Sequence, residues 1–91
     1  MMQEPVSTAG VMHDSKSREI RKRLGQTVRS LREQAGMRQT TVARRIGVSQ
    51  PTMSRVERGH IDLTLSQVYA YAEALGTTVS DLLAALEGAE S

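Results

Sequence analysis

The sequence contains no cysteine, no phenylalanine and no tryptophan, and Tyr69 and Tyr71 are its only aromatic residues. Without cysteine the chain can form no disulfide and can offer no thiolate, and nothing in it indicates secretion. No apolar run reaches the length of a membrane span, and the N-terminus lacks the apolar core of a signal peptide. We therefore expect a cytoplasmic protein that has no membrane partner.

Residues that carry catalysis or hold metals are equally scarce. His13 and His60 are the only histidines, too few for a metal site of ordinary ligand count. The sequence has no Gly-x-Ser-x-Gly nucleophile elbow, no glycine-rich phosphate-binding loop and no pair of acids predicted to face inward. We therefore predict no catalytic residue, no metal and no cofactor, which favours a binding protein over an enzyme.

The charges are segregated along the chain. All twelve lysines and arginines lie between Lys16 and Arg58, together with only three acids, so this segment carries a net charge of +9. The remaining residues contain seven acids and no lysine or arginine, a net charge of −7. This layout is typical of a protein that presents one side to a polyanion. Solvated helix faces would explain the exposure of these charges but not their segregation.

The length and the apolar composition favour a single all-α domain. Ninety-one residues suffice for one modest core, which must consist of leucine, valine, isoleucine, alanine and methionine. The stretch from Gln39 to Gly59 predicts two short helices joined by a tight turn. Apolar residues recur at helical spacing in its first half, at Val42, Ala43 and Ile46. Gly47 is suited to end that first helix.

The second of these helices should begin at Gln50, because Ser49 is a favoured N-cap and Pro51 is tolerated in a first turn. Met53 and Val56 give it a narrow apolar face, and its opposite face is polar. A helix with a small inner face and a hydrogen-bonding outer face suits the major groove of DNA.

The same stretch resembles the phage-repressor/Cro-like (XRE) helix-turn-helix family. The resemblance lies in the spaced set Gln39-x-x-Val42-Ala43-x-x-x-Gly47-Val48-Ser49-x-x-x-Met53-Ser54-x-x-Glu57-x-Gly59. It extends through LSQVYAYAEALG to VSDLL, and so covers roughly residues 17 to 87. It implies a compact five-helix, repressor-like domain in which helices 2 and 3 form the helix-turn-helix. It also implies a bacterial or phage protein that binds double-stranded operator DNA.

The flanking segments complete the expected organisation. We expect residues 1–16 to form a flexible tail, residues 17–87 the DNA-binding domain and residues 88–91 a frayed end. The first helix should run from about Arg18 to Gln34. The apolar stripe of this helix consists of Ile20, Leu24, Val28, Leu31 and Ala35.

Two further helices are expected after the helix-turn-helix. Ile61 and Leu63 should be tucked beneath the loop that precedes them. The fourth helix should run from about Leu65 to Leu75 and be capped by Thr64. Its expected apolar stripe contains Leu65, Val68, Tyr69, Ala72 and Leu75, with Tyr71 at the edge. A fifth helix should follow from Val79 to about Leu86, with Thr78 and Asp81 as a capping pair.

Gln50 and Arg55 are the candidates for base contacts. Glutamine can bond N6 and N7 of adenine, and arginine can bond O6 and N7 of guanine. Pro51 and Thr52 could meet a thymine methyl group. The resemblance supports this assignment, since the matching positions of the family read bases. The alternative is that Gln50 and Arg55 are merely solvated polar residues.

The candidates for phosphate contacts flank these residues. They are Arg38, Gln39, Thr40, Ser54, Arg58 and His60. Gln39 begins a helix, where free N–H groups favour an anion, and the resemblance implies that its amide contacts the DNA backbone. Arg38 stands where the family usually has a threonine or serine cap, which should weaken the cap by up to roughly 1 kcal/mol. The resemblance also implies an ion pair between Arg32 and Glu57 that holds the first helix to the recognition helix.

A single copy of such a domain reads only a few base pairs, so we expect a homodimer on half-sites about 34 Å apart. The candidate dimer residues lie in the C-terminal region and are Tyr69, Val79, Leu82 and Leu86, although the leucines could equally belong to the core. The predicted function is a sequence-specific transcriptional regulator that acts as a repressor. One alternative is an antitoxin that binds a toxin protein and represses its own operon, since TLSQVYAYAEALG resembles part of such antitoxins. A second alternative is a protein-interaction adaptor that does not bind DNA.

Overall fold

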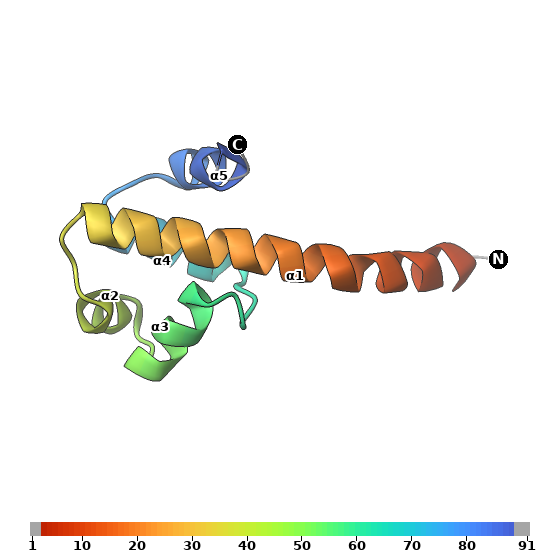
Figure 1. Ribbon diagram of the computed structural model, residues 1–91, viewed down its shortest axis with the longest axis horizontal. Helices are drawn as coiled ribbons and strands as arrows, with labels where there is room; N and C mark the ends of the chain where they lie inside the picture. The colour runs from red at the N-terminus through yellow and green to blue at the C-terminus, as the bar shows by residue number, and fades with distance from the viewer. Residues whose placement is uncertain (1–2, 89–91) are drawn as a thin grey trace.

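The computed structural model describes the backbone of residues 3–88 and the side chains of residues 15–88. This part of the chain contains five α-helices and no strand (Figure 1). The helices are α1 (Gln3–Gln34), α2 (Gln39–Ile46), α3 (Gln50–Glu57), α4 (Leu65–Ala74) and α5 (Val79–Gly88). The all-α, five-helix prediction is therefore confirmed. Residues 1–2 of the expected tail and residues 89–91 of the expected frayed end lie outside the described residues.

The first helix is longer than the sequence pattern predicts. Its backbone is helical from Gln3, so the expected start near Arg18 is wrong. Pro5 lies in the first turn, where a missing N–H breaks no intrahelical bond. Gly10 costs about 1 kcal/mol in a helix but does not end one. The segment has no sustained apolar period, but its proline and its glycine both lie where a helix tolerates them.

The turn between α2 and α3 has the predicted geometry. Gly47 ends α2 in the left-handed conformation, with φ 77° and ψ 31°. Ser49 caps α3, because its Oγ accepts a hydrogen bond from the N–H of Thr52 at 3.2 Å, and Pro51 occupies the first turn. Arg38 precedes α2 but makes no side-chain cap bond. The two helices thus begin at the predicted residues, and the first has the weak cap that the sequence indicates.

Side chains also satisfy the ends of the last two helices. Thr64 and Gln67 form a reciprocal capping box at the start of α4, with distances of 3.2 Å and 2.8 Å. The last carbonyl groups of a helix have no partner within the helix. At the end of α4, Arg45 of α2 donates a hydrogen bond to one of them, the carbonyl oxygen of Ala74, at 3.2 Å. The hydroxyl of Thr78 accepts from the N–H of Asp81 at 3.0 Å before α5.

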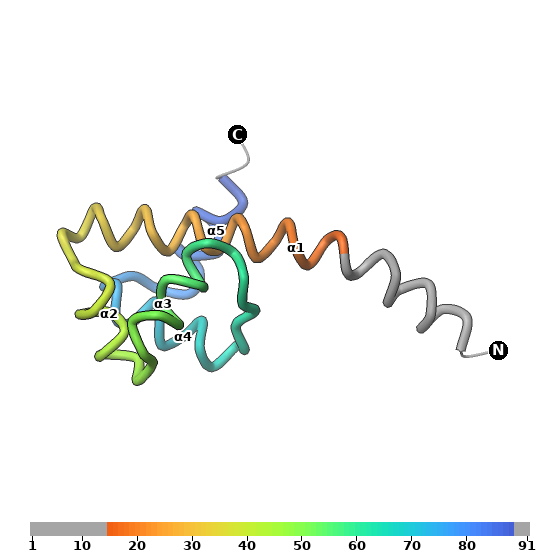
Figure 2. Tube along the Cα trace, turned by 60° about the horizontal axis from the view of Figure 1, so that its bottom comes forward, coloured from red at the N-terminus to blue at the C-terminus, as the bar shows by residue number. Residues whose placement is uncertain are grey.

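The helices enclose one core. α3 contacts α1 and α2, α4 contacts α2 and α5, and α5 also contacts α1. Figure 2 shows α2, α3 and α4 gathered on one side of α1, and Figure 1 shows α5 on the other side from α2 and α3. Ile61 and Leu63 pack against the core, as predicted. The buried apolar residues are Leu24, Val28, Val42, Ala43, Met53, Val56, Tyr71, Ala72, Ala74, Leu75 and Leu82.

The buried face of α4 differs from the predicted one. Tyr71 is only 2% exposed, whereas Tyr69 is 61% exposed and Leu65 is 69% exposed. Tyr71 is therefore a core residue, not an edge residue, and Leu65 and Tyr69 lie outside the buried stripe. The segment carries apolar residues on several faces, so helical spacing alone could not identify the inner one. The buried residues here are Tyr71, Ala72 and Ala74 of α4 and its C-cap Leu75, and Val68 packs against the core while partly exposed.

Burial of Tyr71 predicts a loss of stability in alkali. Burial raises the pKa of Tyr71 from 10 to about 12, and the nearby carboxylate of Glu57 adds to this shift. As the pH rises, the unfolded chain therefore loses this proton before the folded chain does. The free energy of unfolding should then fall between pH 10 and pH 12, by up to about 2–3 kcal/mol from this residue.

Tyr71→Phe should remove this contribution. The buried Oη of Tyr71 has no hydrogen-bond partner among the described residues, so the variant loses no bond and should be at least as stable as the parent at neutral pH. Denaturant unfolding at pH 8 and at pH 11 measures both effects. Tyr69→Phe is the exposed control and should retain the parent's alkaline decline. An equally steep decline in Tyr71→Phe would assign the loss to other groups.

Candidate nucleic-acid interface

α3 divides into a buried apolar face and a solvent-facing polar face. Met53 and Val56 are buried in the core. On the other face, the Ser49 hydroxyl donates to Oγ1 of Thr52 at 3.0 Å, which holds the side chain of Thr52. The predicted base-reading residues all lie on this polar face: Gln50, Pro51 and Arg55 are exposed, and Thr52 is half-buried. The helix therefore presents a row of hydrogen-bonding groups that the core does not use.

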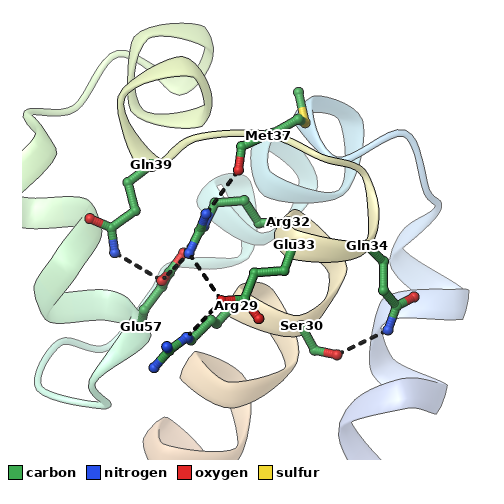
Figure 3. A network of polar contacts seen from close by, with 8 residues as sticks. All are labelled: Arg29, Ser30, Arg32, Glu33, Gln34, Met37, Gln39 and Glu57. Carbon is green, nitrogen blue, oxygen red and sulfur yellow. Dashed lines mark hydrogen bonds and ion pairs between the residues drawn. The ribbon is translucent and has the colours of Figure 1, made fainter.

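A network of side-chain hydrogen bonds joins α1, α2 and α3 beside this polar face (Figure 3). Glu57 accepts from Arg32 at two points, with Nε–Oε2 at 2.6 Å and Nη2–Oε1 at 3.1 Å. Arg32 also donates to the carbonyl oxygen of Met37 at 2.8 Å. Gln39 donates its Nε2 to Oε1 of Glu57 at 2.9 Å, and Gln50 donates its Nε2 to Oε1 of Gln39 at 2.7 Å. The first residue of α3 is thus linked to the ion pair between α1 and α3.

The ion pair expected from the resemblance is present and largely buried. The side chains of Arg32 and Glu57 are 12% and 3% exposed. The hydrogen bond to Glu57 raises the pKa of Arg32, against the lowering effect of burial. Arg32 therefore stays charged and neutralises the carboxylate at the end of α3. This neutralisation removes the repulsion that Glu57 would otherwise exert on an anion near the polar face.

Two glycines let α1 and the end of α3 approach each other closely. A Cβ atom at Gly25 would lie 2.5 Å from the carbonyl oxygen of Val56 and 2.6 Å from that of Glu57. Gly59 has φ 78°, and a Cβ atom there would lie 2.8 Å from Cα of Lys22. Neither site accepts a side chain unless backbone moves. The sequence pattern did not single out Gly25, although an isolated glycine within a helix can mark a close approach of another backbone.

A family model described as a helix-turn-helix domain matches residues 23–86. The chain belongs to the helix-turn-helix family. A curated relative, the uncharacterized HTH-type transcriptional regulator y4dJ of Sinorhizobium fredii, is 35% identical over 65 residues, which are 71% of this chain and 84% of the relative.

Solved structures with the same fold include two regulators. The clp gene regulator ClgR of Corynebacterium glutamicum superposes with a TM-score of 0.75 at 29% identity, covering 79% of this chain and 94% of that one. The restriction-modification controller protein C.AhdI of Aeromonas hydrophila gives a TM-score of 0.65 at 31% identity, covering 68% of this chain and 94% of that one. The predicted XRE-type helix-turn-helix transcriptional regulator is therefore confirmed.

In helix-turn-helix terms, α2 and α3 are the motif and α3 is the recognition helix. The predicted phosphate contacts lie in two groups beside it. Arg38, Gln39 and Thr40 are at the start of α2, and Ser54, Arg58 and His60 are at the end of α3 and in the loop after it. Gln39 and Ser54 are half-buried, and the other four are exposed. The bonds of Gln39 to Gln50 and Glu57 bring the first group next to α3, but the contacts with DNA stay predictions.

The predicted dimer residues of this helix-turn-helix protein have different environments. Leu82 is fully buried in the core, so its assignment to a dimer interface is wrong. Val79 and Leu86 are half-buried against the core, and Tyr69 is exposed. Tyr69 and Val79 line a groove of about 500 Å³ between α4 and the start of α5. Three of the four residues can therefore contribute to an interface.

Other kinds of site are scarce within the described residues. These contain no group of three or more histidine, aspartate or glutamate side chains that could hold a metal ion. None of the helices described combines the length and the apolarity that crossing a bilayer requires.

Proposed function

We propose that this chain is a sequence-specific repressor that reads the major groove of double-stranded DNA with residues 49–58. It would act as a homodimer on a twofold-symmetric operator. The observation that carries the proposal is the ordered polar face of α3, in which Gln39 holds Gln50 and Glu57 holds Gln39. A side chain that is already ordered loses less conformational freedom on binding. ClgR and C.AhdI, a gene regulator and a controller protein, support a regulatory role.

Base recognition is assigned to Gln50 and Arg55. Gln50 lies at the start of α3, which in this motif is the end that contacts base edges. Arg55 lies about a turn and a half further along and is exposed. Gln50 would recognise adenine and Arg55 guanine, each through two hydrogen bonds, with Pro51 and Thr52 against a thymine methyl group.

Phosphate contacts would set the register of α3 in the groove. Gln39 uses one N–H of its amide group for Glu57, which leaves the second N–H for a phosphate oxygen. Arg38 and Thr40 lie beside the free N–H groups at the start of α2, where an anion is favoured. Arg58 and His60 would hold the strand at the other end of α3, together with Ser54. Such contacts position a protein on DNA without reading its sequence.

The homodimer would place two copies of α3 on half-sites about 34 Å apart. Its proposed interface contains Tyr69, Val79 and Leu86, on the side of the molecule formed by α4 and α5. Leu82 would support this surface from within the core. Occupation of a promoter by the dimer would exclude the transcription machinery and so repress the gene.

Selection of binding sites from random duplexes by the purified protein tests the proposal, followed by measurement of affinity at several salt concentrations. A twofold-symmetric consensus is expected. If no consensus emerges and affinity stays at the non-specific level of about 10⁻⁴–10⁻⁶ M, the chain is not a sequence reader by itself.

Arg55→Ala should weaken operator binding by about 1–3 kcal/mol and relax the preference at one base position in each half-site. The matched control is Arg44→Ala on α2, which removes one exposed arginine at a position with no predicted base contact. It should lower affinity for all duplexes equally, if at all. Equal base preferences in Arg55→Ala and the parent would remove Arg55 from the set of base-reading residues.

A further inference from the structure

We propose that a row of cations on α1, outside the helix-turn-helix, binds DNA phosphates beside the segment that α3 reads. This inference rests on the proposed function and adds a second surface to it. The row consists of Arg18, Lys22 and Arg29, with Gly25 between them. Their spacing of four, three and four residues places all four on one face of the helix.

The contacts of Gly25 and Lys22 show which way this face is directed. Gly25 lies against the carbonyl groups of the last turn of α3, since an added Cβ atom would be 2.5 Å from the oxygen of Val56. The backbone of Lys22 lies against Gly59, in the loop that follows α3. The face of α1 that bears the row is therefore next to the end of α3, beside two of the predicted phosphate contacts, Arg58 and His60.

The cations of this row are available for a partner. Arg18 and Lys22 are exposed, and neither forms an ion pair or a side-chain hydrogen bond with any residue between 15 and 88. Arg29 is bonded to Glu33 at 3.2 Å, but both side chains are more than half exposed, so this pair contributes little and can give way to a phosphate. Uncompensated cations beside a DNA-reading helix are the chemistry that a phosphate backbone recognises.

The length of the row also fits a nucleic-acid strand. Arg18 and Arg29 are separated by eleven residues, or about 16 Å along the helix axis. This length corresponds to about five base-pair steps at 3.4 Å each. The row therefore extends the protein's footprint on the side where the loop after α3 meets α1. A solvated helix face that makes no DNA contact would have the same exposure. The salt dependence of DNA binding distinguishes such a face from a phosphate-binding one.

The experiment compares Arg18→Ala and Lys22→Ala with the parent on the selected operator, by fluorescence anisotropy between 50 and 300 mM salt. Each lost phosphate contact should reduce the slope of log affinity against log salt by about 0.9, which corresponds to about eightfold weaker binding at 0.1 M salt. The loss should be the same on matched and mismatched duplexes, because phosphates carry no sequence information. A duplex lengthened by about five base pairs should bind the parent more tightly than a minimal operator, and this gain should be smaller for each variant, which keeps two of the three cations.

Lys16→Ala is the matched control. Lys16 is exposed, carries the same charge and lies about 120° away from Lys22 around α1. Lys16→Ala should keep the parent's slope of log affinity against log salt. If Lys22→Ala and Arg18→Ala also keep that slope while the parent selects an operator, the row on α1 is a solvated face and the proposed function stands. If the parent binds no DNA, the proposed function and this inference fail together.

Discussion

Gly25→Ala should destabilise the domain and abolish its discrimination between operator and random DNA. The new Cβ atom would lie 2.5 Å and 2.6 Å from the carbonyl oxygens of Val56 and Glu57, and 2.8 Å from the carbonyl carbon of Glu57. These are backbone atoms, which cannot rotate out of the way as the end of a side chain can. The α1–α3 contact must therefore open, and the displacement is transmitted to the helix that carries Gln50 and Arg55.

The expected sign is opposite to that of most glycine-to-alanine changes within helices. Alanine has the higher helix propensity by up to about 1 kcal/mol. Overpacking typically costs about 1–3 kcal/mol, occasionally more, so the balance at Gly25 should be unfavourable. For a domain of this size each kcal/mol lowers the Tm by about 4–8 °C. The displaced α3 should retain only non-specific affinity, since bidentate base contacts require accurate placement.

Gly88→Ala is the control for this prediction. Gly88 is also helical, and an added Cβ atom there would meet nothing within 4 Å. Its variant should keep the parent's Tm, by circular dichroism, and the parent's affinity for the selected operator. If Gly25→Ala behaves in the same way, the α1–α3 contact has more freedom than the distances indicate.

The features that the sequence predicts best are local ones. Gly47 and Ser49 determine where α2 ends and α3 begins, because a left-handed residue and an N-cap act on their own helix ends. Thr64 does the same for α4. The ion pair of Arg32 and Glu57 joins residues 25 apart, and only the resemblance to a family implied it.

The features that sequence patterns missed depend on neighbours distant in the chain. The role of Gly25 depends on carbonyl groups about thirty residues later, which no helical period reveals. The choice of Tyr71 over Tyr69 as the core residue depends on how α4 is rotated against α2 and α5. The hydrogen bond of Gln50 to Gln39 joins two residues that were each expected to contact only DNA. Its effect is to order a side chain that we propose reads a base.

Glu57→Ala is expected to cost the domain about 3–5 kcal/mol, since removal of one partner leaves the other charge buried and unpaired. Arg32 would keep its bond to the carbonyl oxygen of Met37 but lose both bonds to a carboxylate. Glu33 lies 3.9 Å from Arg32, but its side chain is 54% exposed, so it compensates for only a small part of the loss. Gln39 would also lose its acceptor, so the side chain of Gln50 would no longer be held.

Glu33→Ala separates the effect of burial from the effect of charge. This variant also removes a carboxylate near Arg32, but the carboxylate of Glu33 is exposed. It should therefore change the free energy of unfolding by less than about 1 kcal/mol. Denaturant unfolding at 0.1 M and 1 M salt compares the two variants. The small effect of Glu33 should shrink at high salt, while the large effect of Glu57 should persist, because buried pairs are screened much less. If both variants shift the unfolding midpoint equally, the pair does not hold α1 to α3, and the close contact at Gly25 and the shared core must do so.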